Sequence, residues 1–256
     1  MNEKYLIEIK ELIIQTVQNK LQHYRPETVK MPFHYRLLGK DRMALFSFIH
    51  SLNTTFGISI FEPVGEYAAR EKFNARRQYP LGNFISTAAQ HEIADIMAGL
   101  RAGISEPDWK KETERLRKAA VKGKMQKIRT VKADLFLKEK GKDKYYLIDL
   151  KTAKPNVSAF EKYKQTLLEW TAIFLTHQPD ADIQAFIAIP YNPYEPQPYK
   201  RWTLKGMLDL HHQLKVGEEF WDFLGGEGTY EALLDTFEQA GMELRPVLDD
   251  YFKRFE

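Results

Sequence analysis

The sequence predicts a mixed α/β fold in which a central mixed β-sheet is flanked by helices, with helical additions at both ends. Three observations favour this fold. Apolar residues recur every three or four positions near both termini, which is typical of amphipathic helices. Two short runs rich in Ile, Val and Leu, 127–138 and 145–151, indicate paired strands. A helical pattern over 160–176 and a buried strand pattern over 185–189 follow them.

The first half of the chain is expected to be mostly helical. Its first helix spans 5–24 and ends before Pro26, because proline cannot continue a helix. Further elements are expected as helices over 43–52, 64–73, 84–99 and 108–118, an extended run over 56–61 closed by Pro63, and a turn over 80–83. The 108–118 helix is highly charged and is expected to lie exposed on the surface.

The second half carries the sheet. The segment 139–144 contains Gly141 and charged residues, which suits an exposed hairpin turn. After the 185–189 strand, the proline-rich and aromatic segment 191–202 reads as an ordered loop, and 205–224 and 229–256 read as helices. No boundary is strong enough to divide the chain, so we expect one domain over 1–256 with a core at about 84–190.

The composition excludes several classes of protein. The 256 residues are 43% hydrophobic and 29% charged, which favours a packed globular chain over disorder. The absence of cysteine excludes disulfides, thiolate zinc sites and iron–sulfur clusters. No apolar run approaches the roughly 20 residues of a membrane helix, and no signal-peptide pattern is present. We therefore expect a soluble, cytoplasmic protein with no membrane partner.

Familiar nucleotide and zinc motifs are incomplete. The glycines near Gly225 are not followed by Gly-Lys-Ser/Thr, and no strand is followed by Gly-x-Gly-x-x-Gly. His91-Glu92 resembles the start of a helical zinc-protease motif, but Asp95 stands where the second histidine belongs. A metal site in this chain would therefore have to be built from carboxylates.

The net charge of +3 conceals an uneven distribution. Residues 70–132 contain 15 Lys and Arg against 7 Asp and Glu, whereas residues 217–256 contain 3 against 11. The basic stretch is a candidate surface for a polyanion such as DNA, and the alternative is a solvated helix face.

One pattern predicts catalysis. Asp134 lies on the first strand of the predicted hairpin, and Asp149 and Lys151 lie on one face of the second, because strands have a period of two residues. A turn centred near Lys142 places Asp134 almost opposite Asp149, with Cβ atoms roughly 4.5–5.5 Å apart. Apolar neighbours such as Leu135 and Ile148 place these charges within a buried strand pair, which is costly without a purpose.

Two converging carboxylates suit a hard divalent cation. We expect Mg²⁺ to be bound by Asp134, Asp149 and the backbone carbonyl of Leu150, because Mg²⁺ prefers oxygen ligands. Lys151 would then orient an attacking water or stabilise charge developing on phosphorus. The predicted chemistry is metal-assisted phosphodiester hydrolysis. The alternative is that these charges form an ordinary solvated surface pair.

Asp134, followed after fourteen residues by Asp149-Leu150-Lys151, resembles the motif of the PD-(D/E)XK nuclease superfamily. Ala133 stands where that motif often has proline. The resemblance implies that Asp134 and Asp149 bind the metal and that Lys151 is the catalytic lysine. It also implies a further glutamate, for which Glu92 is the candidate and Glu62 and Glu66 are alternatives.

A narrower resemblance covers most of the chain. The runs 51–63 and 163–170 resemble the type II restriction endonucleases of the TdeIII type. This resemblance implies cleavage of double-stranded DNA at the base sequence GGNCC. A palindromic target also implies a homodimer, because twofold DNA symmetry calls for two related active sites.

Several side chains outside the motif are expected to contact DNA. Arg76 and Arg77 lie in a predicted loop, Lys164 on the helix after the motif, and Asn192, Lys200 and Arg201 in the proline-rich loop. The competing functions are another nuclease with the same core, of the repair, resolvase or transposon kind, and a DNA-binding protein without catalysis. Neither the base-reading residues, nor the cut position, nor the dimer interface can be predicted from the sequence.

Overall fold

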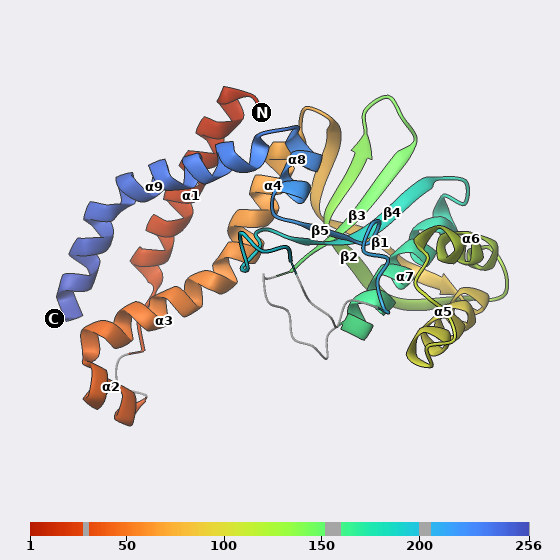
Figure 1. The fold of residues 1–256 in the computed structure, drawn as a ribbon, viewed down its shortest axis with the longest axis horizontal. Coiled ribbons are helices and arrows are strands. Elements are labelled where there is room, and N and C mark those ends of the chain that lie inside the picture. Colours follow the sequence, from red (N-terminus) through yellow and green to blue (C-terminus); the bar gives the residue numbers. More distant parts are fainter. Residues whose placement is uncertain (28–30, 152–159, 200–205, 256) are drawn as a thin grey trace. The chain divides into compact units, whose positions relative to one another are not determined.

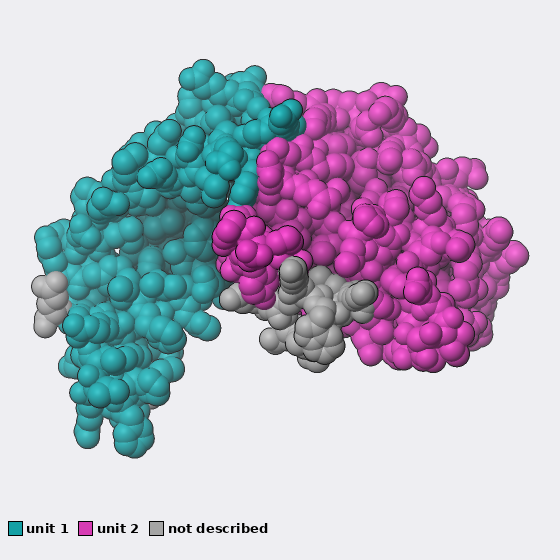
Figure 2. All heavy atoms as spheres, viewed as in Figure 1, with its two compact units in different colours: residues 1–68, 226–256 teal, residues 69–225 magenta. Residues whose placement is uncertain are grey.

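The computed structural model describes residues 1–27, 31–151, 160–199 and 206–255. The chain divides into two compact units, coloured separately in Figure 2. Unit 1 contains residues 1–68 and 226–256, and unit 2 contains residues 69–225. The core expected at about 84–190 lies within unit 2. The description of the whole chain as one domain stays a prediction.

Unit 1 is helical and joins the two ends of the chain. Its elements are α1 (Glu3–His23), α2 (Pro32–Leu38), α3 (Lys40–Thr55), the π-helix η1 (Phe56–Phe61), most of α4 (Glu62–Ala69), α9 (Thr229–Phe252) and the 3-10 turn η4 (Lys253–Phe255). Helix α1 buries Ile9, Ile13, Val17 and Leu21. Its C-terminal part shares a core with α3 and α9, to which Phe48 and Leu244 contribute. The Tyr251 hydroxyl donates a hydrogen bond of 2.8 Å to the Tyr24 carbonyl.

Unit 2 contains the predicted mixed sheet, shown in Figure 1. Its strands are β1 (Phe73–Ser86), β2 (Met125–Glu139), β3 (Lys144–Leu150), β4 (Asp182–Ile189) and β5 (Leu214–Val216), in the spatial order β1-β2-β3-β4-β5. The pairs β1–β2 and β2–β3 are antiparallel, and β3–β4 and β4–β5 are parallel. The predicted fold class, a mixed sheet flanked by helices, is confirmed.

Helices cover both faces of this sheet. The helices α5 (Thr87–Arg101), α6 (Trp109–Ala120) and α7 (Phe160–His177) share one large core with the strands, to which Phe136 and Phe174 contribute. The helix α8 (Glu218–Gly225) places Phe223 against Phe73 and Tyr146. Tyr145 contacts Phe174 instead, because neighbouring strand residues point to opposite faces. The sheet is therefore buried on both sides, which gives its side chains fixed positions.

The segment 56–61 is not the extended run that was expected. It forms the π-helix η1, in which the backbone N–H of Glu62 bonds to the carbonyl of Gly57, five residues earlier. Pro63 lies in the first turn of α4 and does not end the helical path. The β-branched and aromatic composition of the segment favoured a strand, but the helices on either side continue through it.

Strand β1 was not predicted from the sequence. Residues 73–86 were divided into the end of a helix, a turn over 80–83 and the start of another helix. In the structure Pro80 and Gly82 interrupt the pairing of β1 with β2 by register shifts and do not end the strand. Proline is tolerated there because β1 lies at the edge of the sheet. The following helix begins at Thr87, where the Ser86 side chain accepts a hydrogen bond from Ala89 N.

Two other expectations are corrected. The 205–224 segment was expected to be one helix, but its described part contains turns, the short strand β5 and α8. The charged helix α6 was expected to be exposed, yet it buries Glu112, Thr113 and Leu116 on one face. Its hydrophobic face was concealed in the sequence by the surrounding lysines and glutamates.

One helical stretch among the described residues, Lys40–Ala69, is long and apolar enough to cross a membrane by length and composition alone. This differs from the expectation that no such run is present. A single stretch of this kind is weak evidence for a membrane span, because helices of soluble proteins pass the same test.

Candidate active site

The β2–β3 hairpin has the register that the sequence predicted. Leu135 pairs with Ile148, and Phe136 pairs with Leu147. The next position along this register places Asp134 opposite Asp149. The hairpin turn contains Gly141 with a φ of 75°, a conformation that glycine adopts without strain. Two carboxylates from adjacent strands therefore meet at the end of the hairpin.

Each carboxylate is held by a hydrogen bond from β3 or from the residue after it. Asp134 Oδ2 accepts a hydrogen bond of 2.9 Å from the backbone N–H of Leu150. Asp149 Oδ1 accepts one of 2.5 Å from the ammonium of Lys151. Asp149 is buried, with 4% of its surface exposed, whereas Asp134 and Lys151 are half-buried. The predicted convergence of two aspartates and a lysine is thus present in the structure.

Burial dominates the electrostatics of this group. Removal of Asp149 from water raises its pKa to about 7, Lys151 opposes this increase, and the nearby Asp134 carboxylate adds to it. Burial acts to lower the pKa of Lys151, but attraction to Asp149 and Asp134 outweighs it and raises that pKa. Lys151 therefore remains a cation, whereas the carboxyl group of Asp149 stays protonated to a higher pH than an ordinary aspartate does.

The lysine also faces an aromatic ring that the sequence analysis did not assign to the site. Lys151 Nζ lies 5.1 Å from the centre of the Tyr163 ring on α7, within the range of a cation–π interaction. Tyr163 makes an edge-to-face contact with Phe160. The ammonium is therefore bounded by Asp149 and by an aromatic face, which restricts where it can move.

The donor set fits a hard divalent cation. Among the described residues, no group of three or more His, Cys, Asp and Glu side chains could hold a metal. Asp134 and Asp149 supply two carboxylates, and the Leu150 carbonyl is the third oxygen in the predicted set. Burial and, to a lesser extent, repulsion from Asp134 raise the pKa of Asp149, and a cation at this position would stabilise the charged form against both.

The candidate glutamates occupy different surroundings. Glu92 lies on α5 and forms an ion pair with Arg115 of α6. The contacts of Asp134 and Asp149 described above do not include it. Glu62 and Glu66 lie on α4 in unit 1, where Glu62 is buried. Which of the three glutamates completes the site stays a prediction.

The expected DNA-contacting residues are found in several settings. Arg76 and Arg77 are exposed on β1, on a strand where a loop was expected. The Asn192 side chain bonds to Gln197 O at 2.7 Å and to Tyr194 N at 3.1 Å, so both ends of its amide stabilise its own loop. Lys200 and Arg201 lie outside the described residues.

The burial of Lys164 overturns the expectation of a DNA contact there. Its ammonium is fully buried and donates to Glu112 Oε2 at 2.5 Å and to Gln213 Oε1 at 2.7 Å. Burial lowers the pKa of Lys164 and raises that of Glu112. This ammonium is bound within unit 2 and is not available to a phosphate. The spacing of Lys164 from Phe160 and Leu167 places it on the apolar face of α7, a signal that the sequence already contained.

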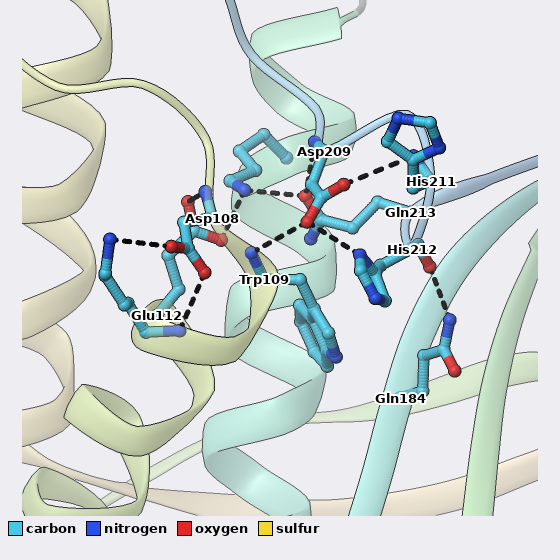
Figure 3. Close-up of polar contacts among 10 residues, drawn as sticks. Asp108, Trp109, Glu112, Gln184, Asp209, His211, His212 and Gln213 are labelled. Carbon is cyan, nitrogen blue, oxygen red and sulfur yellow. Dashed lines mark hydrogen bonds and ion pairs between the residues drawn. The ribbon is translucent and has the colours of Figure 1, made fainter.

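Lys164 of α7 bonds to Glu112 and Gln213. These two residues belong to a polar network between α6 and the turn that precedes β5, which Figure 3 shows. Gln213 Oε1 also accepts a hydrogen bond of 3.2 Å from Asp209 N. The Asp209 carboxylate in turn accepts one of 3.2 Å from Trp109 N and contacts His212 Nδ1 at 2.9 Å. The network fixes α7, the helix that carries Tyr163.

The fold and the site together define a class. A mixed sheet with Asp134 on one strand and Asp149 and Lys151 at the end of the next is consistent with a PD-(D/E)XK restriction endonuclease. The chain belongs to the HinfI family of type II restriction endonucleases, whose family model matches residues 1–241.

The chain is similar to several enzymes named as type II restriction enzymes. It is 27% identical to MjaII of Methanocaldococcus jannaschii over 87% of this chain and 66% of that enzyme. It is 23% identical to HgiEI of Herpetosiphon aurantiacus over 91% of this chain and 92% of that enzyme, and 25% identical to HgiBI of the same organism over 82% and 77%. The resemblance to restriction endonucleases is confirmed. These matches do not test the narrower likeness to the TdeIII type.

The raised pKa of Asp149 predicts a pH-dependent stability without metal. Folding raises this pKa from 3.8 to about 7, so the stability that its protonated form contributes is present below pH 3.8 and is lost as the pH rises through 7. Asp149→Asn should abolish this loss. The free energy of unfolding of the variant, relative to that of the parent, should therefore be higher at pH 8 than at pH 5. Urea unfolding in chelator at both pH values measures the difference. The exposed Asp180→Asn serves as control, and an equal difference at both pH values would contradict the account.

The buried position of Lys164 predicts a structural role. Lys164→Met should lower the free energy of unfolding by about 3–5 kcal/mol, because it leaves the Glu112 carboxylate buried without its cation. The exposed neighbour Lys162 provides the matched control, for which Lys162→Met should change stability by less than about 0.5 kcal/mol. Urea unfolding measures both. Parental stability of Lys164→Met, combined with a weaker salt dependence of DNA binding, would restore Lys164 as a phosphate contact.

Proposed function

We propose that this protein cleaves double-stranded DNA by Mg²⁺-dependent hydrolysis of phosphodiester bonds, with Asp134, Asp149 and Lys151 as its catalytic group. The observation that carries this proposal is the convergence of the two carboxylates and the ammonium at one end of the β2–β3 hairpin. Membership of the HinfI family and the relatives' names as restriction enzymes support the reaction class.

Asp134 and Asp149 are proposed as the metal ligands, together with the Leu150 carbonyl. Type II restriction enzymes generally use divalent metal ions. When bound, a divalent ion would supply Lewis-acid chemistry to the phosphate and to an attacking water. Mg²⁺ is proposed because the three donors are hard oxygens and because Mg²⁺ is commonly held by only one or two carboxylates.

Lys151 is proposed to stabilise the charge that develops on phosphorus during attack. Its ammonium is held at 2.5 Å from Asp149 Oδ1 and faces the Tyr163 ring, so little reorganisation is needed when charge develops. A residue that acts mainly on the transition state affects the rate more than DNA affinity.

The surface of unit 2 is suited to a polyanion. Of the 15 Lys and Arg between residues 70 and 132, all except Arg70 and Arg117 are exposed. Arg76 and Arg77 pair in register with Phe136 and Leu135 of β2, close along the sheet to Asp134. Both are proposed to contact DNA phosphates. The GGNCC target is the expectation that comes with the TdeIII resemblance, and mapping of cleaved ends tests it.

Unit 1 carries a surface suited to a second copy of the chain. Eight large apolar side chains of residues 31–58 are exposed: Met31, Phe33, Leu37, Leu38, Leu45, Phe46, Ile49 and Ile58. Concentrations of exposed apolar surface commonly mark interaction sites. We propose that those of these residues that lie on α2 and α3, termed the α2–α3 face, form the interface of a homodimer. Restriction enzymes are generally soluble and cytoplasmic, and the same location is proposed for this protein.

The catalytic assignment predicts a loss of cleavage rate with DNA binding largely retained. Lys151→Ala should reduce the single-turnover cleavage rate by about 10²–10³, with less effect on DNA affinity, because it removes one electrostatic contact to the transition state. Asp134→Asn and Asp149→Asn should abolish cleavage but retain DNA binding in Ca²⁺. Single-turnover assays with saturating enzyme and a short DNA duplex measure the cleavage rate. Lys142→Ala, at an exposed lysine, is the control. Parental cleavage by Lys151→Ala would remove Lys151 from the mechanism.

If the α2–α3 face is the dimer interface, charged substitutions on it should disrupt the dimer. Phe46→Glu together with Ile49→Glu should convert a dimer into a monomer, because charged side chains at an interface core must lose water without a partner. Light scattering during size-exclusion chromatography gives the mass. Leu234→Glu, at an exposed leucine of α9, is the matched control and should stay dimeric. A parental protein that is monomeric with and without DNA would contradict the dimer proposal.

A further inference from the structure

Gln78 has an unusual backbone conformation beside the candidate site. Its φ of 48° is the only positive φ of a non-glycine residue among the described residues. It lies within β1, where Arg77 pairs with Leu135 and Tyr79 pairs with Ala133. These flanking pairs place Gln78 across from Asp134 on the neighbouring strand.

This conformation is costly for glutamine. A positive φ brings Cβ close to the backbone, and glycine, asparagine and aspartate tolerate it better than a residue with a longer side chain. Strained backbone of this kind persists only where the surrounding structure enforces it, and it is concentrated at functional sites. A strand residue with no role for its side chain would be expected to be glycine here.

The side chain of Gln78 reaches the carboxylate that we propose as a metal ligand. Gln78 Nε2 lies 3.4 Å from Asp134 Oδ1, a long hydrogen bond. The other oxygen of the same carboxylate, Oδ2, accepts a hydrogen bond of 2.9 Å from the backbone N–H of Leu150. Asp134 is therefore held from both sides, by a side chain of β1 and by the main chain of β3.

We propose that Gln78 is a positioning residue for Asp134, and that its strained backbone directs the amide at this carboxylate so that Asp134 and Asp149 are oriented toward one cation. The inference rests on the proposed metal-dependent function. A neutral amide suits this role because it donates to the carboxylate without adding a third negative charge beside Asp149. Partners that orient metal ligands commonly contribute about 10–100-fold to metal affinity or activity.

Two substitutions relieve the backbone strain and also remove the contact with Asp134. Gln78→Gly removes both the strain and the amide, whereas Gln78→Asn keeps an amide that tolerates positive φ but is one methylene too short to reach Asp134 as Gln78 does. Both variants should melt at the parental temperature or a few degrees above it in chelator. Both should need about 10-fold more Mg²⁺ for the half-maximal metal-induced rise in Tm, and should cleave about 10-fold more slowly.

Asn74→Gly is the control, since Asn74 is an exposed residue of the same strand without a positive φ. It should lower Tm and leave the Mg²⁺ requirement unchanged. The inference would be overturned if Gln78→Gly lowered both the Tm and the cleavage rate, or if it kept the parental Mg²⁺ requirement. Either result would show that Gln78 only shapes the strand. If the proposed function itself were wrong, the result would differ from this one, because the parental protein would neither cleave DNA nor gain stability from Mg²⁺.

Discussion

The burial of the Asp149 carboxylate next to a second carboxylate, Asp134, is the constraint on which the candidate site depends. The two carboxylates are brought together by the β2–β3 register, and Asp149 is buried as well. Burial first, and then repulsion from Asp134, raise its pKa to about 7, so the charged form is disfavoured there. Lys151 offsets part of this cost, and a divalent cation would offset more. A site that is costly without a cation and favourable with one is suited to metal-dependent chemistry.

The rest of unit 2 fixes the positions of these groups. The sheet is covered on both faces, so its register cannot slip without moving apolar side chains to the wrong side. The buried pair of Lys164 and Glu112 anchors α7, which presents Tyr163 to Lys151. Charged residues thus have two roles in this unit: one pair stabilises the scaffold, and the other group is available for chemistry.

The sequence predicted the hairpin and its three charged residues because strand periodicity and a glycine-containing turn determine both register and face. Strand β1 was missed because Pro80 and Gly82 resemble a turn, and only pairing with β2 makes the segment extended. The conformation of Gln78 was missed for the same reason. Lys164 was assigned to the surface because its charge outweighed its position on an apolar helix face. Burial of a paired charge depends on α6, which lies far from it in sequence.

The central claim is that the hairpin site gives the protein metal-dependent and site-specific cleavage of DNA. Digestion of a sequenced plasmid with the parental protein, with Mg²⁺ or with chelator, followed by sequencing of the fragment ends, tests it most directly. Discrete fragments with a common end sequence are expected in Mg²⁺, and intact plasmid is expected in chelator. Binding without cleavage under both conditions, or cleavage that continues in chelator, would contradict it.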